Sequence, residues 1–314
     1  MAYHLNKRVL LFTLWIKRCG VACVLGLLFL FNPAVSLAEG KFKELYFLNL
    51  RNTLVGIHVR DTQLAFQVMM NKIIRTRYPD YRIIVAFPED IAAAKLAIDK
   101  QRGHVLIINS LDFVDKRQEL TLEPLHILSK ADQPTQSYLL LAAADKNFET
   151  LAKQQHHTLV VENGGSGEIA RAWLSTWLRQ RGYKPVEPFF SAIRVADKPS
   201  RAILPVFFGE ADTCVVTESA FSVMAELNPQ IKQKLKILAR SPGFVNLIVC
   251  TTKHIDPLDK QRVFDEAMAI NESADGQQVL TIIQMKRIFK FESNDFAATE
   301  ALYRNYNQLS KKDG

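Results

Sequence analysis

Residues 53–109 alternate between two hydrophobic periods, one typical of strands and one typical of amphipathic helices. Short apolar runs rich in β-branched residues predict strands, and longer runs with apolar positions three and four apart predict the helices between them. Asp61 and Asp90 stand at the N-cap positions of the two helices, and Gly103 stands where the second helix ends. The predicted order is strand 53–59, helix 62–78, strand 81–87, helix 90–103 and strand 104–109. Such a βαβαβ unit has parallel strands.

The same order of patterns returns about a hundred residues later. It predicts strand 157–163, helix 167–182, strand 188–195, helix 200–209 and strand 212–217. Two copies of one unit imply two similar lobes. The expected fold class is therefore α/β, with each lobe a mostly parallel sheet flanked by helices.

Two further apolar stretches, 122–147 and 235–254, are long enough to pass between the lobes as extended strands. We interpret them as two crossovers, which makes residues 39–142 plus 243–314 the first lobe and 143–242 the second. The helical patterns at 259–270, 276–289 and 294–309 should then cover the first lobe. Because no stretch has the composition of a flexible linker, a hinge between the lobes is expected.

The N-terminus has the pattern of a secretory signal peptide. Four basic residues and no acidic ones precede or enter an apolar run that ends in Ser36-Leu37-Ala38, so cleavage is expected after Ala38. Retention of residues 1–38 as a membrane anchor is the less favoured alternative, because the run is short and Pro33 interrupts its end. Neither Cys19 nor Cys23 has the small-apolar box that lipidation needs. The mature chain should be soluble and periplasmic.

Loss of this segment lowers the formal net charge from +8 to +4, which is too mild and dispersed to indicate nucleic-acid binding. Cys214 and Cys250 remain, and their apolar surroundings favour two buried thiols over a disulfide. No His or Cys spacing of zinc type is present, and the adjacent His156 and His157 do not form a metal site. We expect no metal and no cofactor.

The stretch 159–178, LVVENGGSGEIARAWLSTWL, places a glycine cluster between a strand and a helix. A dinucleotide fingerprint (G-x-G-x-x-A from Gly165) is a weak match in an exported chain, and a serine nucleophile elbow fails because Glu168 stands where it needs glycine. Converging backbone N–H groups at a helix N-terminus, with Ser166 as cap or donor, would instead form an anion cradle. The remaining alternative is that the glycines serve turn geometry alone.

With these features the chain resembles the phosphate-, phosphite- and phosphonate-binding periplasmic proteins of ABC transporters, within the type 2 periplasmic-binding fold. The resemblance spans about residues 53–285, and its marks are the strand-turn-helix at 159–178, FFGEADTCVVTESAF at 207–221 and ARSPGF at 239–244. It implies two lobes joined by two strands, which close over a small oxyanion delivered to a membrane permease.

The family's hydroxyl-rich S-T-S-G turn falls on Gly164, Gly165, Ser166 and Gly167, so two of its three hydroxyls are missing here. The family also tends to place an aromatic residue after the third strand, where this chain has Asn109, Ser110 and Asp112. Phosphonate specificity is therefore not carried over from the resemblance.

In an open α/β sheet the ligand lies beyond the carboxyl ends of the strands. Four loops should meet there, at 59–63, 109–113, 162–168 and 217–221. Glu218 argues for a ligand with a cationic or hydroxyl part, unless it is a solvated helix cap, and Arg60 is either an anion ligand or a surface residue. The candidate ligand-binding residues are Arg60, Asp61, Thr62, Asn109, Ser110, Gly164, Gly165, Ser166, Gly167, Thr217, Glu218 and Ser219.

The sequence thus predicts a non-enzymatic, monomeric, exported solute-binding protein for a small anionic ligand, with a membrane permease as partner. Three alternatives remain: a sensor subunit that docks on a membrane signalling receptor, an enzyme with Glu218 or Asp112 as general base, and a rigid interaction surface with a degenerate cleft.

Overall fold

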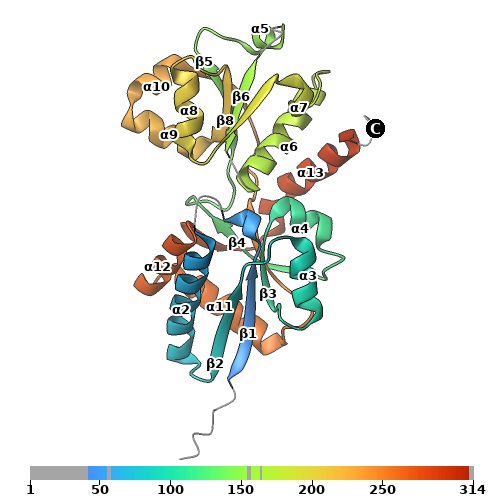
Figure 1. Cartoon of the computed structure of the whole chain (residues 1–314), viewed down its shortest axis with the longest axis vertical. Coiled ribbons are helices and arrows are strands. Elements are labelled where there is room, and N and C mark those ends of the chain that lie inside the picture. The colour runs from blue at the N-terminus through green and yellow to red at the C-terminus, as the bar shows by residue number, and fades with distance from the viewer. Residues whose placement is uncertain (1–41, 55–57, 154–156, 163–164, 311–314) are drawn as a thin grey trace, which may run out of the picture. The chain divides into compact units, whose positions relative to one another are not determined.

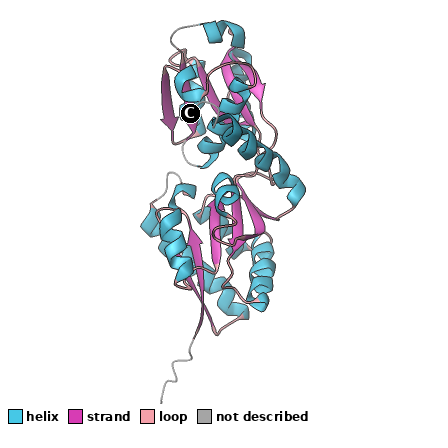
Figure 2. Cartoon of the chain, turned by 90° about the vertical axis from the view of Figure 1, so that its right-hand side faces the viewer, coloured by secondary structure: helices cyan, strands magenta, loops and turns pink. Residues whose placement is uncertain are grey.

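The structure is a computed structural model that describes residues 42–54, 58–153, 157–162 and 165–310. Its strands form two sheets, and we call the elements packed on each sheet a lobe. Helices cover both faces of each sheet (Figures 1 and 2). Of the helices described, none is long and apolar enough to span a membrane. The predicted signal peptide, residues 1–38, lies outside the described residues.

The first lobe contains a six-stranded sheet within the described residues. Its order is β11-β4-β10-β3-β1-β2. The predicted strands β2 and β3 are both parallel to β1, which the pattern does not predict, whereas β10 and β11 run antiparallel to their neighbours. The strands are β1 (Lys43–Asn49), β2 (Tyr81–Ala86), β3 (Val105–Asn109), β4 (Glu123–Ser129), β10 (Leu247–Thr251) and β11 (Arg287–Lys290).

Two apolar clusters hold helices on opposite faces of this sheet. One joins it to three helices, α2 (Val59–Arg77), α11 (Pro257–Ile270) and α12 (Ala274–Ile282). The other joins it to α3 (Ile91–Asp99), α4 (Ser110–Lys116) and the first turns of α13 (Ser293–Ser310).

The second lobe repeats the plan with the strand order β7-β6-β8-β5-β9. Here β7-β6-β8 are parallel and β5 is antiparallel to both β8 and β9, so this sheet is also mixed. The strands are β5 (Tyr138–Ala143), β6 (Thr158–Glu162), β7 (Ala192–Ala196), β8 (Thr213–Thr217) and β9 (Leu235–Arg240). The helices are α5 (Phe148–Lys153), α6 (Gly165–Arg179), α7 (Val186–Phe189), α8 (Pro199–Phe207), α9 (Glu218–Leu227) and α10 (Pro229–Lys234).

The start of the first lobe differs from the sequence prediction. The first strand is β1 rather than 53–59: residues 51–53 form a 3₁₀ turn, in which the Thr53 hydroxyl bonds the Asn49 side chain and the Leu50 carbonyl. Helix α2 begins at Val59, and its N-cap is His58, so the prediction of Asp61 as cap is wrong. Asp61 lies inside the first turn, where a carboxylate still complements the helix dipole. Asp90 does cap α3, accepting a bond from the Ala93 N–H at 2.8 Å.

Other differences occur where strands begin late or helices end early. The predicted strand 188–195 starts only at Ala192, because Pro188 and Phe189 belong to α7. The predicted helix 276–289 stops at Ile282, and the segment after it forms the edge strand β11. Helix α13 does not cover the first lobe alone: it packs against α4 and also against α6, and Leu302 is buried in the apolar cluster of the second lobe.

The two cysteines within the described residues are free, buried thiols, as predicted: Cys214 in β8 and Cys250 in β10. Burial raises the pKa of each thiol well above its usual value. Neither has the electropositive, accessible surroundings of a reactive cysteine.

The two chain crossovers are joined by hydrogen bonds. Residues Gln136 and Phe244 form an antiparallel bridge. Beside it the Tyr138 hydroxyl donates to Asn246 Oδ1 at 2.7 Å, and Asn246 Nδ2 donates to Gln136 Oε1 at 2.6 Å. The Tyr138 N–H donates to Ser241 Oγ at 2.8 Å. These bonds tie the segment that leaves the first sheet to the segment that returns to it.

His126 in β4 is a buried histidine stacked on Phe264 of α11, with 4.8 Å between ring centroids. Neither imidazole nitrogen has a hydrogen-bond partner among the described residues. Burial lowers the pKa of His126 from 6.5 to about 4. The folded protein therefore holds this side chain neutral at pH values where an exposed histidine is charged.

We predict that His126→Leu makes the protein less sensitive to acid. Below pH about 6.5 the unfolded chain takes up a proton that the folded chain accepts only near pH 4, so wild-type stability falls across that interval, by about 2 to 3 kcal/mol at pH about 4.5. Urea unfolding at about pH 7 and about pH 4.5 measures this loss. Between these two pH values the free energy of unfolding of His126→Leu should fall by about 2 to 3 kcal/mol less than that of wild type. The matched variant His58→Leu, which changes an exposed histidine, should lose as much stability as wild type. Equal losses in all three proteins would contradict the prediction.

Candidate ligand-binding site

Two of the predicted ligand loops follow buried strands directly and begin helices. Asn109 ends β3, and its side-chain oxygen caps α4 by accepting a bond from the Asp112 N–H at 2.9 Å. Thr217 ends β8 and caps α9 in the same way, through the Ala220 N–H at 3.3 Å. Both capping residues are buried, so these helix starts are fixed to the strands before them. The alternative that Glu218 is the helix cap is wrong, because Thr217 caps α9.

Carboxylates and amides from both lobes meet near Asn109. The Asn109 amide donates to Asp112 Oδ2 at 2.6 Å and to Glu168 Oε2 of α6 at 3.4 Å. Asn52 donates to the same Asp112 oxygen at 3.2 Å. Desolvation by the surrounding chain raises the pKa of Glu168, and the negative charge of Asp112 raises it further. This cluster favours a proton or a cationic group between its two carboxylates.

The glycine turn has one demonstrable packing role. A Cβ on Gly167 would lie 1.8 Å from the Glu162 carbonyl oxygen, so only glycine allows α6 to begin so close to the end of β6. Helix α6 starts at Gly165. Gly164 lies outside the described residues, as does the side chain of Ser166.

A polar groove of about 710 Å³ lies between the first crossover and α9. Its walls are the segment 130–137, the α9 residues Glu218, Ser219, Ser222 and Val223, and Lys286 before β11. Its charged groups are partly paired already, since Glu218 forms an ion pair with Arg240 and Lys286 forms one with Asp132. Burial raises the pKa of Glu162 at the end of β6, and the charge of Lys130 partly offsets that rise.

The structure thus separates the predicted site residues into groups. Glu218 and Ser219 line the groove, and Thr217 orients them, with 3.3 Å between the Thr217 and Ser219 hydroxyl oxygens. Asn109 and the neighbouring Ser110 lie at the carboxylate cluster, and Ser110 is fully buried with no partner for its hydroxyl among the described residues. Arg60, Asp61 and Thr62 lie in the first turn of α2 and are not among the groove residues.

Sequence reasoning missed several polar residues of this region. These include Lys130, Gln133 and Gln136 of the first crossover, for which the apolar pattern predicts only a connecting role. The signal was present: the charged and amide residues of SKADQPTQS directly follow a buried strand. The missed residues also include Glu162 and Glu168, which flank the glycine turn and which no motif marks as ligand contacts.

Comparison with known proteins places the chain in a family. A family model described as "ABC transporter, phosphonate, periplasmic substrate-binding protein" matches residues 60–296, most of the chain. The chain belongs to this family of periplasmic phosphonate-binding proteins. No curated protein matches it.

Solved structures with the same fold include members of this family. A Xanthomonas citri protein bound to chloride ion has a TM-score of 0.61 at 12% identity, over 85% of this chain and 99% of that one. PhnD1 from Prochlorococcus marinus, in complex with methylphosphonate, has a TM-score of 0.55 at 14% identity, over 85% of this chain and 99% of PhnD1. A binding protein component of an ABC phosphonate transporter from Pseudomonas aeruginosa has a TM-score of 0.54 at 12% identity, over 86% and 99%.

These findings confirm the predicted family, fold class and general function. The protein is a periplasmic substrate-binding protein of the phosphonate-binding family, with the two-lobed α/β architecture of type 2 periplasmic binding proteins. The parallel pairing in each lobe is as expected, although β1 replaces the predicted strand 53–59, and both sheets are mixed because the crossover and C-terminal strands add antiparallel partners.

We predict that Gly167→Ala destabilises the protein by about 3 kcal/mol, because the new methyl group meets a backbone oxygen that cannot move aside alone. Gly182→Ala is the matched control: Gly182 has a positive φ of 80° but open space around it, so the cost is backbone strain of about 1 kcal/mol. Chemical denaturation of the three proteins measures both values. If Gly167→Ala costs no more than the control, the glycine is not needed for packing.

Proposed function

We propose that the protein binds a small phosphonate-type oxyanion that also carries an ammonium or hydroxyl donor. Membership of the family suggests that the ligand contains an oxyanion. The excess of hydrogen-bond acceptors around the candidate site suggests that the ligand also carries a donor. Asp112, Glu162 and Glu168 are all there, whereas Arg240 and Lys286 already form ion pairs with Glu218 and Asp132. Carboxylates repel a bare dianion unless a proton or a cation lies between them.

Lys130 is the cation best placed for the anionic end of the ligand. It lines the groove and has no ion-pair partner among the described residues. The backbone N–H groups at the glycine turn before and at the start of α6 would also donate hydrogen bonds to the anion. These groups belong to Gly164, Gly165, Ser166 and Gly167. The remaining proposed ligand contacts come from three helix starts. They are Arg60, Asp61 and Thr62 of α2, Asn109 and Ser110 at the start of α4, and Thr217, Glu218 and Ser219 at the start of α9.

Binding would act through the crossovers. The bonds among Gln136, Tyr138 and Asn246 fix the two connecting segments to each other, and a ligand that contacts both lobes would favour a closed arrangement. The closed, monomeric protein would then deliver the ligand to a membrane permease. This role requires no catalytic group, and we propose none.

We predict ligand-dependent stabilisation of protein that has been unfolded and refolded to remove bound ligand. Melting temperature is recorded against phosphate, phosphite, alkylphosphonates, aminoalkylphosphonates, sulfate and amino acids. A ligand at about a hundred times its dissociation constant adds roughly 2.7 kcal/mol, a shift of several degrees. Phosphonates that carry an ammonium or hydroxyl group should give larger shifts than phosphate.

Three variants test the assigned contacts. Ser166→Ala and Glu218→Gln should reduce the ligand-induced shift, and Glu226→Gln, an exposed glutamate on the same helix as Glu218, should leave it unchanged. No shift with any compound would overturn the transport role and favour a sensor or interaction surface. Equal shifts in Glu218→Gln and wild type would remove Glu218 from the site.

We also propose export with cleavage after Ala38. Protein purified from the periplasm should begin at Glu39, which intact-mass measurement and N-terminal sequencing can establish. Ala38→Leu removes the small residue that the peptidase requires and should leave the full chain in the membrane fraction. A full-length wild-type chain in the membrane would show instead that the segment is retained as an anchor.

A further inference from the structure

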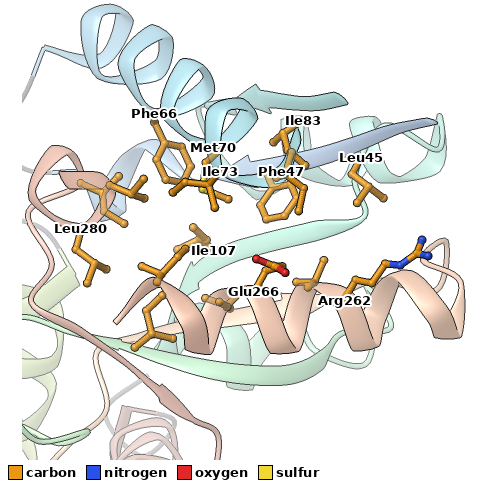
Figure 3. Close-up of a pocket in the computed structure, with 18 of the residues that line it drawn as sticks. Leu45, Phe47, Phe66, Met70, Ile73, Ile83, Ile107, Arg262, Glu266 and Leu280 are labelled. Carbon is orange, nitrogen blue, oxygen red and sulfur yellow. The ribbon is translucent and has the colours of Figure 1, made fainter. Parts of the chain in front are cut away.

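The first lobe contains a cavity that the ligand site does not use. It lies inside the apolar cluster between α2, the sheet, α11 and α12, and its volume is about 70 Å³ (Figure 3). A single water molecule needs only roughly 10–15 Å³ of such space. Close-packed protein interiors contain few voids larger than one water, so a cavity of this size is unusual.

The walls of the cavity are almost wholly apolar. Phe66, Met70 and Ile73 project into it from α2, and Ile107 of β3 faces them from the sheet (Figure 3). Leu280 of α12 closes one end. A buried water needs two to four polar partners, which these side chains do not offer. The cavity therefore suits an apolar occupant better than water.

The two charged residues at the cavity already have partners. Glu266 forms an ion pair with Arg77 at 2.7 Å. Arg262 contacts the Tyr81 hydroxyl and lies 3.4 Å from Asp259, and its guanidinium points away from the cavity, toward the outer end of α11 (Figure 3). With both charges satisfied, the cavity has no unpaired group for a charged ligand, and the occupant should be neutral.

Polar bonds to the edge strand explain why α2 does not collapse into this space. Gln63, Gln67 and Asn71 lie four residues apart along α2 and bond the backbone of β2: Gln63 to the Val85 carbonyl at 2.9 Å, Gln67 to the Val85 N–H at 2.9 Å, and Asn71 to both groups of Ile83 at 2.8 and 2.9 Å. Lys72 holds the other side of the helix to α12 through Asp275 at 2.8 Å. Closing the cavity would break these bonds.

We propose that this cavity is a binding site for a small, neutral, apolar molecule about the size of benzene. The site is separate from the polar groove between the first crossover and α9, and it does not depend on which anion that groove binds. Its ligand would fill space that the amide bonds of α2 keep open.

Benzene and xenon are the probes that test the proposal, with protein purified from the periplasm. Saturating benzene should raise the melting temperature by about 2 to 4 °C. In methyl-resolved NMR spectra both probes should shift the signals of Ile73 and Val279, which line the cavity, and leave Ile203 of the second lobe unchanged. A phosphonate titration of the same sample reports the groove independently.

Filling the cavity provides the matched comparison. Ala267→Leu adds three carbons at a lining residue of α11, whereas Ala97→Leu adds the same group on α3, on the opposite face of the sheet. The benzene effect should vanish in Ala267→Leu and persist in Ala97→Leu. Met70→Phe is a second filling variant, should Ala267→Leu fail to fold. Absence of any benzene or xenon effect in wild type, or a benzene effect that survives in the filled variants, would overturn the proposal.

Discussion

The two-lobed architecture depends on the hydrogen bonds that tie the crossovers together. Chain segments that connect two sheets leave the ladders of both, and their buried polar groups must find new partners. Here Tyr138, Gln136 and Asn246 supply side-chain partners, and Gln136 and Phe244 still pair through the backbone. Tyr138 is almost fully buried, so its hydroxyl would cost free energy without Asn246. These bonds hold the two connecting segments side by side within a few residues of both sheets.

Side-chain amides from the helices bond the backbone of both edge strands of the first sheet. Its two edge strands, β2 and β11, have backbone groups that face no further strand. The Asn71 amide bonds both backbone groups of Ile83 in β2, and the Asn271 amide bonds both groups of Ile288 in β11, at 2.7 and 2.9 Å. An amide that mimics a neighbouring strand protects the edge and fixes the position of its own helix. The same geometry that protects β2 holds α2 above the apolar cavity.

Hydrophobic periodicity predicted the second βαβαβ unit and the last two strands of the first, because most of these strands are buried and the helices between them are amphipathic. It failed where short-range polar contacts decide the structure. At residues 51–53 the hydrogen bonds of the Thr53 hydroxyl favour a turn. The pattern does not predict the strand β1 that precedes this turn. Helix α13 was assigned to one lobe because its sequence does not reveal which surfaces its apolar residues meet, and it packs against both α4 and α6. The caps at Asn109 and Thr217 follow the pattern of strand end and helix start, whereas the position of Lys130 at the groove depends on tertiary placement.

Family membership and ligand chemistry therefore rest on different residues. The architecture is carried by buried strands, crossovers and close-packed glycines such as Gly167, which tolerate little change of volume. The proposed ligand contacts depend on other positions: the sequence has glycine at 164 and 165 and carboxylates at 112, 162 and 168. A raised pKa at Glu162 and at Glu168 means that each carboxylate gains from a proton or a cation nearby. Under the proposed function, a ligand that brings a hydrogen-bond donor should bind more tightly than one without, because the latter would leave buried carboxylates unpaired.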